Sequence, residues 1–127
     1  MKKLIALLLL CLSSGCATVG SLQPGAGGST FDVTGKSYDE IWKASVRGMS
    51  SNLTIVESDR ASGTIKSEAR VGMATWGEVV GLFIRPTVPK ADRYTVEVQS
   101  LKRSRLQITG QDHEPAVIAI IKAELGL

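Results

Sequence analysis

The sequence predicts an α+β domain, in which one antiparallel sheet carries two helices packed on the same face. Two stretches place apolar residues at helical spacing, and other short stretches alternate apolar with polar residues, as half-buried strands do. The predicted order is strand, helix, four strands and helix, with an extra strand in residues 71–86 left open. For that order, a two-layer arrangement with both helices on one face is the economical one.

The first helix has the clearest start signal in the chain. It follows a short predicted strand in which Phe31 and Val33 alternate with polar neighbours. Ser37 and Glu40 have the spacing of a capping box, in which the serine hydroxyl accepts from the amide of Glu40 and the glutamate reaches back. One stripe of the helix is then apolar: Tyr38, Ile41, Trp42, Val46 and Met49.

The remaining elements follow from alternation and from turn residues. Residues 53–57 and 64–68 are predicted to form a hairpin across the polar turn at 58–63. Residues 94–99 alternate as a half-buried strand, Lys102-Arg103-Ser104 forms a turn, and residues 106–109 return as a strand that ends at Gly110. Asp112 is then expected to cap a heavily apolar last helix that lies on the sheet.

Residues 71–86 fit no single period, because three glycines interrupt an otherwise apolar run. Two interpretations stay open. The segment completes the core as a buried irregular strand or short helix, or it forms an exposed loop that dips into a membrane or docks a partner. For the second interpretation, the contact residues would be Trp76, Val80, Leu82, Phe83 and Ile84.

The N-terminus has the pattern of a secretory signal. Lys2 and Lys3 precede nine apolar residues, which as a helix span about 14 Å, against about 30 Å for the hydrocarbon layer of a bilayer. A transmembrane span is therefore not expected, and a cleaved signal peptide is. Small residues 13–15 then lead into Cys16.

This leader resembles the lipobox of bacterial lipoprotein signal peptides, although Ser13 stands where that family usually carries Leu. The resemblance implies cleavage of residues 1–15 and acylation of Cys16, with palmitate-like chains that anchor the protein permanently. Ala17 follows the cysteine where an Asp would hold such proteins at the inner membrane, so the resemblance implies the outer membrane. A plain secreted protein with a free Cys16 is the alternative.

Cleavage also changes the charge and cysteine arithmetic. The 112 remaining residues carry 13 basic and 12 acidic side chains, so the net charge of +3 in the whole chain gives no argument for nucleic acid. Cys11 leaves with the leader and Cys16 would carry lipid, so no thiol is left for a disulfide or a metal. Residues 16–29 are rich in glycine and have no apolar period, which predicts a lipid-anchored flexible tether rather than a phosphate loop. The predicted periplasmic domain is 30–127.

A second resemblance concerns the folded part. Residues 38–42, 53–59 and 63–65 together look like small envelope lipoproteins of Gram-negative bacteria, whose domains are similar to the helix-grip repeats of the barrel-assembly lipoprotein C. The resemblance covers residues 30–68, and the last helix agrees with it in order. It concerns fold-forming residues, so it implies architecture more than role.

No motif supports catalysis, a metal or a cofactor. The single histidine, His113, has no spaced partners and is expected to be an exposed residue near a helix start. Three cations meet in the predicted turn, Lys102, Arg103 and Arg105, and they could contact lipid phosphates or an acidic partner. The alternative is a solvated hairpin tip that discourages edge pairing.

The sequence therefore predicts a non-enzymatic lipoprotein of the outer membrane, with its domain in the periplasm. Its expected role is a binding or scaffolding module in cell-envelope assembly or maintenance, with an envelope protein as partner. A carrier that holds a small apolar ligand or lipid between helix and sheet is the alternative.

Overall fold

The computed structural model describes residues 17–70, 77–87, 92–103 and 112–127, and it confirms the predicted α+β fold. The helices are α2 (Tyr38–Ser50), α3 (Glu114–Leu125) and a short 3-10 helix, η1 (Val19–Ser21). The strands are β1 (Ser29–Thr34), β2 (Thr54–Asp59), β3 (Thr64–Glu68), β4 (Glu78–Pro86) and β5 (Arg93–Lys102).

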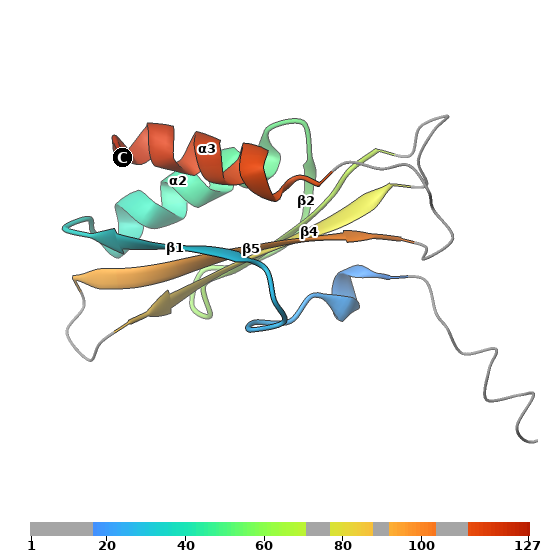
Figure 1. Ribbon diagram of the computed structural model, residues 1–127, viewed down its shortest axis with the longest axis horizontal. Helices are drawn as coiled ribbons and strands as arrows, with labels where there is room; N and C mark the ends of the chain where they lie inside the picture. Colours follow the sequence, from blue (N-terminus) through green and yellow to red (C-terminus); the bar gives the residue numbers. More distant parts are fainter. Residues whose placement is uncertain (1–16, 71–76, 88–91, 104–111) are drawn as a thin grey trace, which may run out of the picture.

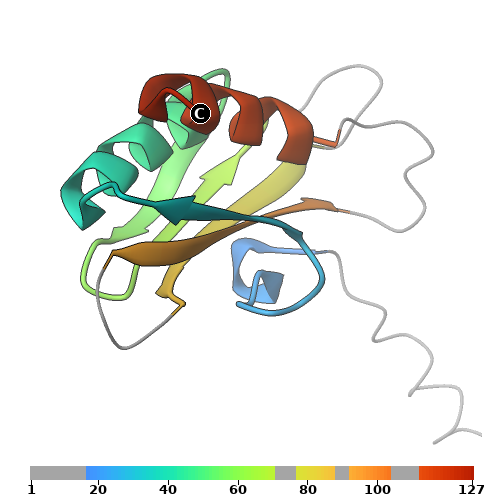
Figure 2. The ribbon, with the colours of Figure 1, turned by 60° about the vertical axis from the view of Figure 1, so that its left-hand side comes forward.

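The five strands form one antiparallel sheet in the order β1-β5-β4-β3-β2. The two longest strands, β4 and β5, therefore lie inside the sheet, and β1 and β2 are its edges. Both α2 and α3 lie side by side on one face (Figure 1). In the turned view, the segment that contains η1 lies against the opposite face (Figure 2).

The start of α2 is the predicted capping box. The Glu40 amide donates to Ser37 Oγ at 3.1 Å, and the Ser37 amide donates to Glu40 Oε2 at 2.7 Å. These two hydrogen bonds satisfy amide groups that a helix start leaves without intrahelical partners. The predicted apolar stripe also packs on the core, with Ile41 and Met49 fully buried.

The two helices approach each other closely at Gly48. A Cβ on this residue would lie 2.9 Å from Ile121 Cγ1 and 3.2 Å from the Val117 carbonyl oxygen, so only glycine fits without a shift of α3. Gly48 therefore sets how tightly α2 and α3 pack. The main core fills the space between these helices and the sheet: Val33, Ile41, Ala44, Met49, Ile65, Val80, Leu82, Ile84, Tyr94, Val96, Val98, Val117, Ile121 and Leu125.

Most predicted strands are confirmed, with changed ends. The hairpin of β2 and β3 is present, with a register shift between Ile55 and Glu57. The strand predicted at 94–99 is β5, which continues through Lys102, so the predicted turn there begins later. The strand predicted at 106–109 lies outside the described residues. The open stretch 71–86 contains β4, a regular strand paired on both sides.

Candidate functional site

Four of the predicted contact residues lie in β4 and are buried. Val80 and Leu82 are 0% exposed, and Phe83 and Ile84 are 3% exposed. The prediction of an exposed contact loop is therefore wrong for these four residues, and the alternative of a buried strand is confirmed. The strand is covered on both faces, so its residues are apolar without alternation, which is why no period fits it.

The other predicted contact residues have different outcomes. Lys102 lies exposed at the end of β5. Arg103 is partly exposed, and its guanidinium forms an ion pair with Glu68 at 2.9 Å. Cys16, Trp76 and Arg105 lie outside the described residues. Of the predicted basic turn, the structure thus describes two cations at one end of the sheet.

Residues 17–28, which we call the N-terminal strap, lie across the face of the sheet that the helices leave open (Figures 1 and 2). Leu22 is 1% exposed and packs with Val79 and Phe83 in a second, smaller core. Ala17 and Val19 pack at its margin. The structure thus corrects the prediction of a flexible tether, because residues 17–28 belong to the folded domain.

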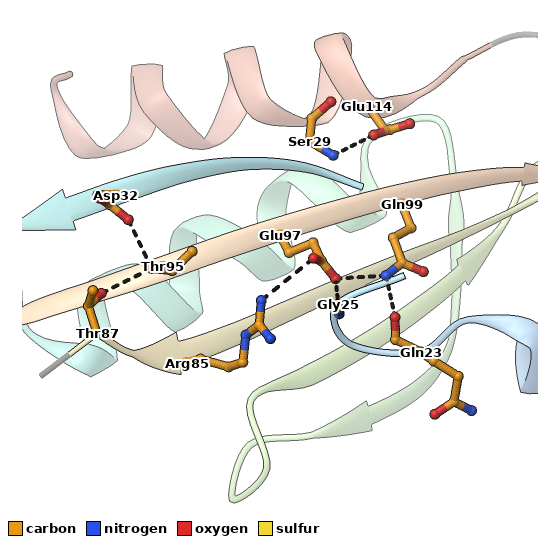
Figure 3. Close-up of polar contacts among 10 residues, drawn as sticks. All are labelled: Gln23, Gly25, Ser29, Asp32, Arg85, Thr87, Thr95, Glu97, Gln99 and Glu114. Atoms are coloured by element: carbon orange, nitrogen blue, oxygen red, sulfur yellow. Dashed lines mark hydrogen bonds and ion pairs between the residues drawn. The ribbon is translucent and has the colours of Figure 1, made fainter. Parts of the chain in front are cut away.

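A buried carboxylate holds the middle of the strap (Figure 3). The side chain of Glu97 in β5 is 4% exposed, and its Oε1 accepts from the Gly25 amide at 2.8 Å. The same oxygen accepts from Gln99 Nε2 at 2.7 Å, and Oε2 lies 3.5 Å from Arg85 Nη2. Gln99 also donates to the carbonyl of Gln23. Backbone groups of the strap thus hydrogen-bond to polar side chains of β5. The Glu97 and Gln99 side chains in these bonds are buried and shielded from water.

Two glycines allow the strap to approach the sheet. A Cβ on Gly28 would lie 2.5 Å from the Val98 carbonyl oxygen, and a Cβ on Gly81 would lie 3.1 Å from Leu22 Cβ. The first glycine belongs to the strap and the second to β4. Gly28 is one of the glycines that suggested a linker in the sequence. In the structure it is required for close packing.

The strap begins at the end of the sheet where β5 finishes. The Ala17 amide donates to the Arg103 carbonyl at 2.6 Å, and the Arg103 amide donates to the Gly77 carbonyl at 3.3 Å. The same end carries Arg70, which is exposed and follows β3. The structure therefore brings together the first residue of the strap and the cations Arg70, Lys102 and Arg103.

His113 differs from its prediction. Its side chain is 13% exposed rather than open to solvent, and Nε2 lies 3.4 Å from Oε2 of Glu78, whose side chain is 3% exposed. The helix begins one residue later than expected, with His113 in the N-cap position. Asp112 still contributes to the start, because its carboxylate accepts from the Glu114 amide at 2.9 Å. The contact between His113 and Glu78 connects the start of α3 to the start of β4.

The outer side of α2 is charged. Asp39 binds Lys43 Nζ at 2.9 Å and Arg60 Nη2 at 2.9 Å, and these partners, Lys43 first, hold the pKa of the Asp39 carboxyl below its ordinary value. A surface groove of about 240 Å³ runs beside these residues. It is lined by Lys36, Glu40, Lys43, Ala44, Arg47, Glu124 and Leu125. Arg47 and Glu124 pair across it at 3.0 Å, so its cations and carboxylates largely compensate each other.

Within the four described ranges, no group of three or more His, Cys, Asp or Glu side chains is placed to hold a metal ion. None of the described helices combines the length and the apolar content needed to cross a bilayer. The chain matches no protein-family model, and no curated protein matches it significantly.

Sequence reasoning missed the residues that hold the strap. Glu97 and Gln99 alternate with valines in β5 and looked like the solvent side of a half-buried strand. Leu22 is one apolar residue in a glycine-rich stretch, which gives no period. The only signal available was the glycine in the middle of an apolar strand, Gly81, since such a residue often marks a close approach of another segment.

Proposed function

We propose that this chain is a non-enzymatic lipoprotein of the outer membrane, anchored through acylated Cys16, whose periplasmic α+β domain is a binding or scaffolding module in cell-envelope assembly or maintenance. The observation that carries the proposal is that the residue after Cys16 is docked on the folded domain. Ala17, the residue after the proposed acylation site, already hydrogen-bonds to Arg103 at 2.6 Å. Cleavage before Cys16 would leave this contact of Ala17 in place, which supports the interpretation of the leader as a lipoprotein signal peptide.

The packing favours a scaffold over the alternative of a carrier. In the described part of the chain, the interface between the helices and the sheet is filled by large side chains, among them Met49, Leu82 and Ile121, each 0% exposed. The groove beside α2 opens to solvent and is lined mainly by charged side chains. A surface of this kind suits polar recognition of a protein partner, whereas an apolar ligand needs an apolar cavity.

Acylation is tested on the full chain expressed in a Gram-negative host. We expect the intact mass of the mature protein to equal residues 16–127 plus a diacylglyceryl and an acyl group, and we expect it in the outer-membrane fraction. The matched variant Cys16→Ser should leave the chain unacylated and displace it from that fraction. A wild-type chain that lacks lipid, or that shares the distribution of Cys16→Ser, would contradict the proposal.

The scaffolding role needs a separate test. A strain without the protein should show an envelope defect, such as leakage of periplasmic enzymes or sensitivity to detergent. Wild-type protein should restore the barrier and Cys16→Ser should not, because a module of the envelope must be held at the membrane. An intact barrier in the deletion strain under envelope stress would remove this part of the proposal.

A further inference from the structure

We propose that the end of the sheet where β5 finishes rests on the phosphate layer of an anionic membrane, so that the domain stands on the bilayer in one orientation rather than moving on a tether. The contact residues are Arg70, Lys102 and Arg103. This inference rests on the proposed acylation of Cys16, and the experiment below separates the two.

The first step is the length of chain between lipid and domain. The Ala17 amide donates to the Arg103 carbonyl at 2.6 Å, directly after the last residue of β5. Consecutive Cα atoms are about 3.8 Å apart. A lipid on the residue before Ala17 therefore attaches within one residue of a fixed point on the domain, and the acyl chains cannot enter a bilayer unless this end of the sheet comes to its surface.

The second step is that the attachment is rigid. Leu22 is buried against Val79 and Phe83, and the Gly25 amide donates to the buried Glu97 carboxylate at 2.8 Å. A glycine-rich segment free in solution would let the domain move tens of ångströms from the lipid, since about twelve such residues have a root-mean-square span near 20 Å. The docked strap removes that freedom.

The third step is the charge of this end. Arg70 and Lys102 are exposed, and Arg103 is partly exposed. Three carboxylates lie on nearby segments: Glu68, which is paired with Arg103 at 2.9 Å; Glu78, which is 3% exposed and lies 3.4 Å from His113; and Asp112, which accepts from the Glu114 amide. Among the described residues, the exposed charges of this end are therefore mainly cationic, which suits a surface of lipid phosphates. Charge and attachment thus point to the same end of the domain.

The experiment uses the acylated full-length protein in vesicles of phosphatidylcholine with phosphatidylglycerol that carry a quencher on the lipid headgroup. The mature chain would hold no free thiol, so the variants Lys102→Cys and Arg93→Cys each give one labelling position. Each substitution replaces one exposed cation by cysteine. The two positions lie at opposite ends of β5, about 30 Å apart at 3.3 Å per residue.

We expect a fluorophore at position 102 to be quenched severalfold more than one at position 93. The variant Gly25→Pro removes the amide that binds Glu97 and cannot adopt the φ of +79° at this position, so it should free the strap and bring the two signals together. The matched control Gln23→Ala keeps the backbone carbonyl that accepts from Gln99 and should leave the difference unchanged. Circular dichroism of Gly25→Pro shows whether the domain remains folded. If it does not, the difference in quenching between positions 102 and 93, measured in the wild-type and Gln23→Ala backgrounds, decides whether the domain has one orientation.

The outcomes separate the two proposals. Acylated protein with equal quenching at positions 102 and 93 would overturn the orientation and leave the lipoprotein function standing. Unacylated protein that does not bind the vesicles would overturn both. A difference that is the same in vesicles of pure phosphatidylcholine would overturn the role of the cations, because only the strap would then orient the domain.

Discussion

The Gly25 amide donates to Oε1 of Glu97 at 2.8 Å, which joins a backbone group of the N-terminal strap to a carboxylate buried in the middle of the sheet. The two residues are 72 positions apart in the chain. Because the carboxylate also accepts from Gln99, one buried side chain organises both the strap and the strand beneath it. The face of the sheet opposite the helices is therefore covered by the strap through specific contacts.

Replacement of Glu97 by Ala should free the strap. The Gly25 amide would lose its acceptor in a site closed to water, and Gln99 would keep only the Gln23 carbonyl, at a cost of about 1–3 kcal/mol in the free energy of unfolding. Urea unfolding of the full chain measures this loss. The control is Gln23→Ala: Gln23 is exposed and meets Gln99 through its backbone carbonyl, so loss of its side chain should cost less than about 0.5 kcal/mol. Equal losses for the two variants would contradict the account.

Replacement of Phe83 by Asp should be severely destabilising. Phe83 is 3% exposed and packs with Leu22 and Val79, so the change removes a large apolar side chain and buries a charge. Loss of the aromatic contacts alone costs about 3–5 kcal/mol. We expect a large fall in melting temperature, whereas Val56→Asp, at a position 47% exposed in β2, should change it little. An unchanged melting temperature for Phe83→Asp would contradict the burial of Phe83.

Replacement of Gly48 by Val should separate the two helices. A Cβ at this position meets Ile121 Cγ1 at 2.9 Å, and the branched side chain adds two more carbons to the overlap. We expect a loss of about 1–3 kcal/mol, the usual cost of overpacking. Thermal unfolding monitored by circular dichroism gives the comparison with Ser50→Val, which places the same side chain at an exposed position of α2. If both variants unfold together, close packing of the helices at Gly48 is wrong.

The capping box should make stability depend on pH in the acid range. The Ser37 amide and hydroxyl hydrogen-bond to Glu40 and lower the pKa of its carboxyl below the ordinary value of 4.5. A lowered pKa in the folded state means that the contribution is complete above pH 4.5 and disappears as the pH falls through the folded value. Carbon-13 NMR titration of Glu40 measures its pKa directly.

The variant Ser37→Ala is the control for that titration. It removes the cap hydroxyl, so the pKa of Glu40 should rise toward its ordinary value, and the domain should lose about 1 kcal/mol of stability at neutral pH. A Glu40 carboxyl that titrates identically in both proteins would show that the Ser37 hydroxyl does not contribute to the lowered pKa.

The elements predicted best were those specified by local chemistry. The capping box of Ser37 and Glu40 and the hairpin of β2 and β3 each depend on residues within a few positions of one another. The fold class followed from the order of such elements. The strand β4 was harder to predict, because a strand covered on both faces has no alternation. Its apolar run is also interrupted by Gly81, where Leu22 of the strap packs closely against the sheet.

The strap could not be predicted from local pattern. Its contacts to Glu97 and Gln99 span more than 70 positions, and a glycine-rich segment looks the same in sequence whether it is free or docked. The partner of His113 was missed for the same reason, because Glu78 lies 35 positions away. Contacts of this length are decided by the topology of the sheet, which brings β4, β5 and the strap together only after folding.

Amide hydrogen exchange at Gly25 in the full-length protein tests directly whether the strap is docked on the sheet. A strap docked on the sheet should slow exchange of this amide by orders of magnitude relative to an unstructured peptide, and Glu97→Ala should restore fast exchange while the amides of α2 stay protected. If Gly25 in the wild-type protein exchanges as fast as in a free peptide, residues 17–28 are a tether, and the proposed fixed attachment of the domain to a membrane is wrong.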